Sequence, residues 1–159
     1  MGPSLRKLAL TAHVTSSVGW LGAVASFLAL AVVGLTSQDA KVVRAVSLAN
    51  ELTAWYVIVP LSFASPLTGI LQSLGTKWGL FRHYWVLIKF LITIPCTILL
   101  LLHMRPIHAL ARVAAETNFS DLGRLQIQLV AKAGAALVVL LVATTLSVYK
   151  PEGVTRWGK

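Results

Sequence analysis

The sequence predicts an all-α protein, a four-helix transmembrane bundle that forms a single integral membrane domain over residues 1–159. Two features of its composition indicate this class. Of the 159 residues, 57% are hydrophobic and only 12% are charged, and this charged share is about half that of an average soluble domain. The apolar residues also gather into four long runs, and these runs lack the period-two alternation of a membrane strand.

The four runs differ in the ionisable groups that they carry. The first has His13 as its one ionisable side chain, the third contains Lys89, and the second and fourth carry no charge. About 20 apolar residues cross a bilayer as a helix. The first three runs are therefore long enough, and the fourth helix is expected to begin before its uncharged part, near Leu125. The predicted spans are residues 8–35, 52–76, 83–104 and 127–149.

The segments between the spans predict two further helices. Apolar residues at 42, 43, 46 and 48 indicate a short surface helix in the connection Ser37–Glu51. Residues 106–116 place Ile107, Leu110, Ala111 and Ala114 at helical spacing, which predicts an amphipathic helix lying on the membrane surface.

Proline and cysteine add local expectations. Pro60 and Pro66 lie within the second span, where they should bend the helix and free backbone carbonyls that nearby Ser or Thr residues help to satisfy. Cys96 is the one cysteine of the chain, so no intrachain disulfide can form, and nothing resembles a zinc site.

The charge distribution favours a membrane surface over nucleic acid. The net charge is +9, but a nucleic-acid module would need an exposed basic face, and the sequence shows none. The expected partner is the lipid bilayer, with basic loops at its surface. A slight excess of Lys and Arg on the side of the termini predicts that both termini are cytoplasmic, in a bacterial cytoplasmic membrane. The sequence leaves the oligomeric state open, a homo-oligomer included.

Two nitrogen-bearing side chains stand out inside the predicted membrane segments. An ammonium such as that of Lys89 costs about 2.5–3.5 kcal/mol at the centre of a membrane helix on insertion scales. His13 follows Arg6 by seven residues, and Lys89 follows Arg82 by seven. The first and third spans run parallel, so both groups lie roughly 10 Å past a basic anchor in the same leaflet. Two donors at matched depth could ligate one metal or haem between them.

Each donor has companions on its own helix face. The two predicted stripes are His13, Ser17 and Trp20 in the first span, and Trp85, Lys89, Thr93 and Cys96 in the third. A structural interpretation stands beside this one. Lys89 could extend to the nearer interface, and His13 could be a neutral histidine bonded to a backbone carbonyl.

Two stretches carry a resemblance to known families. "HVTSSVGWLGA", residues 13–23, resembles the first helix of the HemJ-type protoporphyrinogen oxidases and of the CopD-like copper-resistance membrane proteins. "YWVLIKFLITI", residues 84–94, is similar to their lysine-bearing helix. The overall pattern looks closest to a bacterial family of small integral membrane proteins of unknown function. The resemblance covers under half of the chain. It implies a b-type haem with His13 and Lys89 as axial ligands.

The resulting expectation is a small membrane b-type haem protein with a redox or electron-transfer role. The haem would lie between the first and third spans, beside Ser17, Trp20, Trp85 and Thr93, with Arg82 placed to pair with its propionates. As an oxidoreductase it would oxidise a porphyrinogen or act with a quinol, so a quinone and a redox partner protein are candidate partners. The alternative is a haem-free structural or transport subunit with CopD-like metal handling. Met1 and Met104 are the only methionines, which gives copper handling little support.

Overall fold

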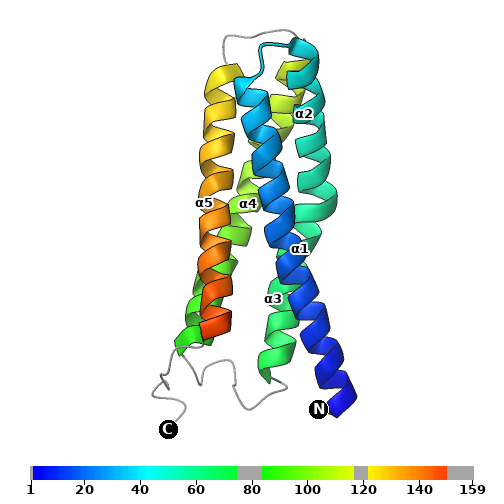
Figure 1. Cartoon of the computed structure of the whole chain (residues 1–159), viewed down its shortest axis with the longest axis vertical. Helices are drawn as coiled ribbons and strands as arrows, with labels where there is room; N and C mark the ends of the chain where they lie inside the picture. Colours follow the sequence, from blue (N-terminus) through cyan, green and yellow to red (C-terminus); the bar gives the residue numbers. More distant parts are fainter. Residues whose placement is uncertain (1, 75–83, 117–121, 150–159) are drawn as a thin grey trace.

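The structure is an all-α bundle of four rods, and consecutive rods run in opposite directions (Figure 1). It is a computed structural model that describes residues 2–74, 84–116 and 122–149. Three helices follow one another without a break in the second rod. The elements are α1 (Pro3–Thr36), α2 (Ala40–Thr53), the π-helical segment η1 (Ala54–Ile58), α3 (Val59–Leu74), α4 (Tyr84–Glu116) and α5 (Leu122–Tyr149).

The rods are arranged so that α1 and α4 occupy opposite corners of the bundle. Each of these two helices packs against the α2–α3 rod and against α5. The lower end of the bundle in Figure 1 is where α1 and α4 begin and where α3 and α5 end. Side chains of α1 and α4 that face inward at this end therefore face each other across the bundle.

The surface of the bundle is as apolar as its interior. Trp20, Val24 and Phe27 of α1 pack in the core with residues of the other three rods. Large apolar side chains also cover the outside, among them Leu8 and Leu91, which are 65% and 73% exposed. Three stretches are long and apolar enough to cross a membrane, and the described apolar part of α4 is shorter. They are Pro3–Thr36, Ala40–Leu74 and Gly123–Tyr149, with Val86–Leu102 in α4. An apolar exterior of this kind suits a lipid bilayer.

The connection that precedes the second span is helical as predicted, but it does not form a separate surface helix. Asp39 caps α2 by accepting a hydrogen bond from the backbone N–H of Lys41 at 2.8 Å. The helix then buries Val43, Ser47 and Asn50 and continues directly into η1 and α3. The prediction of a surface location was wrong because this face packs against α1 and α4.

Residues 106–116 are also helical, but they continue α4 instead of forming a separate amphipathic helix. Here too the expected surface location was wrong. Ile107 is only 5% exposed, and α4 packs against α2 as well as α5. Ile107, near the start of this segment, is therefore covered by other helices of the bundle and not by the membrane surface.

The two prolines of the second rod lie where the chain is helical, and Pro66 is inside α3. Pro66 has no N–H for the carbonyl four residues earlier, that of Ser62. The hydroxyl of Thr97 in α4 lies 3.3 Å from this carbonyl and 3.0 Å from the carbonyl of Thr93 in its own helix, so its one proton is shared between the two acceptors. Pro60 is the second residue after η1. The residue between them, Val59, bonds through its N–H to the carbonyl five residues earlier, that of Ala54. The expectation that a freed carbonyl finds a Ser or Thr partner is thus confirmed at Pro66.

A buried side-chain hydrogen bond joins α5 to α1 near the upper end of the bundle. Gly34 lies in the last turn of α1, where backbone carbonyls lose their helical partners. The amide of Gln126 in α5 donates to the Gly34 carbonyl at 2.9 Å. A Cβ at Gly34 would lie 3.0 Å from the side chain of Val46, so glycine permits the close approach of α1 and α2 here.

Candidate cofactor-binding cavity

A cavity of about 440 Å³ lies between all four rods at the lower end of the bundle. We call it the lower cavity. Its volume falls within the range of about 300–1,000 Å³ that ligand pockets occupy. Its wall carries many polar side chains. These are His13 and Ser17 of α1, Ser65, Gln72 and Ser73 of α3, Lys89 and Thr93 of α4, and Thr144 and Ser147 of α5.

The structure brings His13 and Lys89 to this one cavity. They belong to α1 and α4, the two helices at opposite corners of the bundle. Both side chains are partly buried. The lower cavity thus has one nitrogen-bearing side chain from each of two diagonal helices.

The hydrogen bonds of His13 define its tautomer. Its Nδ1 lies 3.1 Å from the carbonyl oxygen of Ser65 and 3.2 Å from Oγ1 of Thr68. A carbonyl can only accept, so Nδ1 carries the proton. The Thr68 hydroxyl is consistent with this, because it donates to the Ala64 carbonyl at 2.6 Å and can accept from His13. In the neutral ring the lone pair is therefore on Nε2.

The bond from Nδ1 to a backbone carbonyl is compatible with both interpretations of His13, as a structural histidine and as a metal ligand. A bond to a backbone carbonyl is what a structural histidine in the bundle would make. It is also what metal-binding histidines make with their second nitrogen, because that bond orients the ring and fixes the tautomer.

Gly69 of α3 makes room for the imidazole. A Cβ at this position would lie 3.1 Å from Cε1 and 3.4 Å from Nδ1 of His13. Next to it, the hydroxyls of Ser17 and Ser65 are hydrogen-bonded at 2.9 Å. The ring of His13 is therefore seated on α3 by contacts with Ser65, Thr68 and Gly69.

Three of the other residues predicted for the site line the lower cavity, and two lie outside the described part of the chain. Ser17 and Thr93 line the lower cavity, but the Thr93 hydroxyl donates to the carbonyl of Lys89 at 2.6 Å and not to His13. Trp20 is 2% exposed and lines both the lower cavity and a second one above it. Arg82 and the side chain of Trp85 lie outside the described residues.

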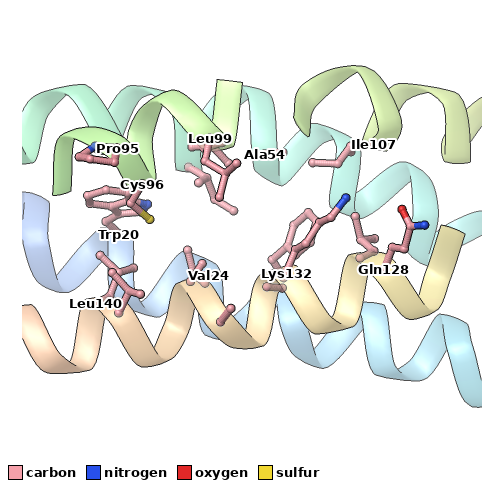
Figure 2. A pocket seen from close by; sticks show the side chains of 18 of the residues that line it. Trp20, Val24, Ala54, Pro95, Cys96, Leu99, Ile107, Gln128, Lys132 and Leu140 are labelled. Carbon is pink, nitrogen blue, oxygen red and sulfur yellow. The ribbon is translucent and has the colours of Figure 1, made fainter. Parts of the chain in front are cut away.

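Cys96, which the sequence places on the same face of this helix as Lys89, lines a second and more apolar cavity. Figure 2 shows it there beside Trp20. It follows Lys89 by seven residues, which is about 10 Å further along the helix.

The described residues contain no group of three or more His, Cys, Asp or Glu side chains that could hold a metal ion.

The sequence did not single out Ser65, Thr68 and Gly69, although they position His13. One signal was present. Ser62, Ser65, Gly69 and Ser73 follow at intervals of three and four residues and so form one stripe of α3. Small residues in a stripe indicate a close helix contact within a membrane.

Comparison with known proteins adds no identification: no family model, curated protein or solved structure matches this chain. The function is therefore argued from the lower cavity and its residues.

Proposed function

We propose that this chain is a small membrane b-type haem protein with an electron-transfer role, and that His13 and Lys89 are the axial ligands. The observation that supports this most strongly is the seating of His13. Its Nδ1–H donates to the Ser65 carbonyl, so the lone pair for a metal bond is on Nε2. Lys89 lines the same cavity from the opposite corner of the bundle.

The residues of the lower cavity fit a haem in several respects. Its wall combines hydroxyl groups with the apolar surfaces of Trp20, Val86 and Phe90. Apolar surface suits a macrocycle, and hydroxyls suit its polar substituents. Bound haem would supply a one-electron couple.

The protein's own part in this proposal is to position the two ligands. The Ser65 carbonyl holds the His13 ring, and Gly69 gives that ring its space. The amine of Lys89 has a lone pair to donate only after it loses its proton, because an ammonium has no acceptor site. We further propose that Arg82 pairs with the propionates and that Trp85 packs nearby.

The cellular setting completes the proposal. The electrons would come from a membrane reductant such as a quinol and pass to a partner protein. The membrane would be the bacterial cytoplasmic membrane, with both termini on the cytoplasmic side, in accord with α1 beginning and α5 ending at the same end of the bundle (Figure 1).

The test is the absorption spectrum of protein purified in detergent after expression with ample haem. We expect a low-spin b-type spectrum in the wild type, and its loss or a change to high spin in His13→Gly and Lys89→Met. Lys132→Met is the matched control, because Lys132 lines the second cavity. Free imidazole should restore the low-spin spectrum of His13→Gly, which separates ligand loss from misfolding.

Two outcomes would contradict the proposal. A colourless wild-type protein under these conditions would leave the lower cavity without haem. A haem spectrum that Lys89→Met leaves unchanged would show that lysine is not the second ligand.

A further inference from the structure

The second cavity, which we call the upper cavity, lies above Trp20 and has a volume of about 520 Å³. Most of its lining comes from α4 and α5, with α1 and η1 behind. Several residues of its wall are also exposed at the outer surface, including Leu91 and Leu99. In a membrane this surface faces acyl chains, so the cavity opens sideways to the bilayer.

The space exists because small residues face it. α5 contributes Ala133, Ala135 and Ala136, and α4 contributes Pro95 and Cys96. Side chains this small leave a gap between α4 and α5, two helices that pack against each other.

A charged side chain that lines the upper cavity lies at one of its ends. Figure 2 shows Lys132 and Gln128 at the end near Ile107, with Trp20, Cys96 and Leu140 at the other end. The Lys132 side chain extends from α5 toward α4 in this view. Among the described residues that line the cavity, Lys132 is the one charged group.

Lys132 also marks a boundary along α5. The 17 residues that follow it, 133–149, carry no charge, and they rise about 26 Å, close to the thickness of the hydrocarbon core. Lys132 therefore lies at the level of lipid headgroups, whereas Cys96 and Trp20 lie deeper.

We infer that the upper cavity binds one acyl chain of an anionic phospholipid, whose phosphate lies against Lys132. The chain extends along the apolar wall toward Cys96 and Trp20. The charge of Lys132 selects an anionic headgroup, and Gln128 offers a further hydrogen-bond donor beside it. The inference does not depend on haem in the lower cavity.

Cys96 provides the probe, because it is the one cysteine of the chain and lies at the deep end of the cavity. The protein is reconstituted in bilayers of phosphatidylcholine, with or without one part in three of phosphatidylglycerol. The rate at which a membrane-permeant maleimide alkylates Cys96 is then measured. Native mass spectrometry of the same samples counts the lipids retained.

We expect phosphatidylglycerol to slow alkylation and to be retained preferentially. Lys132→Gln should reduce this preference about fivefold, which corresponds to ~1 kcal/mol for one lysine at an anionic surface. Lys41→Gln, an exposed lysine of α2 outside the cavity, is the matched control and should keep the preference. Ala136→Phe should abolish phosphatidylglycerol retention while Lys132 is intact, because it fills the space for the chain.

Each of the following results would contradict the inference. Equal protection by both lipids, or by neither, would mean that the cavity selects no anionic lipid. Protection by oleate but not by phosphatidylglycerol would point to a free fatty acid. Protection that rises with protein density at fixed lipid composition would show that a second copy of the chain covers Cys96.

Discussion

Gly69→Ala tests whether the ring of His13 is seated on α3. The new methyl carbon would lie 3.1 Å from Cε1 and 3.4 Å from Nδ1 of the ring. Carbon atoms in favourable contact are about 3.5–4.0 Å apart, so the ring must move away by a few tenths of an ångström. The Nδ1 bonds of 3.1 and 3.2 Å both go to α3, and this movement would lengthen them.

The size of the effect follows from two opposing terms. A methyl group inserted against the His13 ring costs about 1–3 kcal/mol, because the ring can shift into the lower cavity only by weakening its bonds to α3. Replacing glycine by alanine within a helix gains about 1 kcal/mol. Gly22→Ala on α1 provides the control, because nothing lies within 4 Å of a Cβ there. The helical gain is common to both variants, so their difference isolates the overpacking term of about 1–3 kcal/mol.

Thermal unfolding in detergent, followed by circular dichroism, measures this difference. For a chain of this size, 1 kcal/mol shifts Tm by about 2–4 °C, so Gly69→Ala should unfold roughly 2–12 °C below Gly22→Ala. If Gly69→Ala is as stable as Gly22→Ala or more so, the imidazole does not lie against Gly69. A haem-bound sample should in addition lose part of its low-spin spectrum.

Two further predictions concern hydrogen bonds between rods. Thr97→Val should destabilise the protein by roughly 0.6 kcal/mol, a typical value for a hydrogen bond between membrane helices, whereas Thr97→Ser should not. In a Pro66→Ala background the restored N–H can bond to the Ser62 carbonyl, so Thr97→Val should destabilise the protein much less. Equal losses of stability in the two backgrounds of this double-mutant cycle would refute the hydrogen bond from Thr97 to Ser62. Gln126→Met removes the buried donor to the Gly34 carbonyl and should cost about 1–3 kcal/mol in chemical unfolding, and an unchanged midpoint would contradict this role.

The helices were the part of the structure that the sequence could predict, because charge is costly in lipid and its absence marks the spans. The ends of the helices were less predictable. α2 and the last part of α4 have apolar faces that suit either a membrane surface or a helix partner. Either lipid or α1 could cover Val43. Which of them does so depends on the tertiary structure, and the spacing of apolar residues along the chain does not determine it.

The candidate site was predictable to a similar degree. The depth of His13 and Lys89 follows from counting residues along two parallel helices, and both line the lower cavity. The partner of His13 did not follow in the same way. Ser65 is 52 residues away in the chain, and its carbonyl, as a backbone group, leaves no mark in the sequence.

The length of the rods has a practical consequence for experimental structure determination. α1 and the α2–α3 rod have 34 and 35 residues, about 50 Å each, against about 30 Å of hydrocarbon. A chain of 159 residues is small for particle alignment in cryo-electron microscopy when a micelle covers most of it. The helical end that projects beyond the micelle, around the capped start of α2, offers a rigid epitope to which an antibody fragment could be raised as an alignment marker.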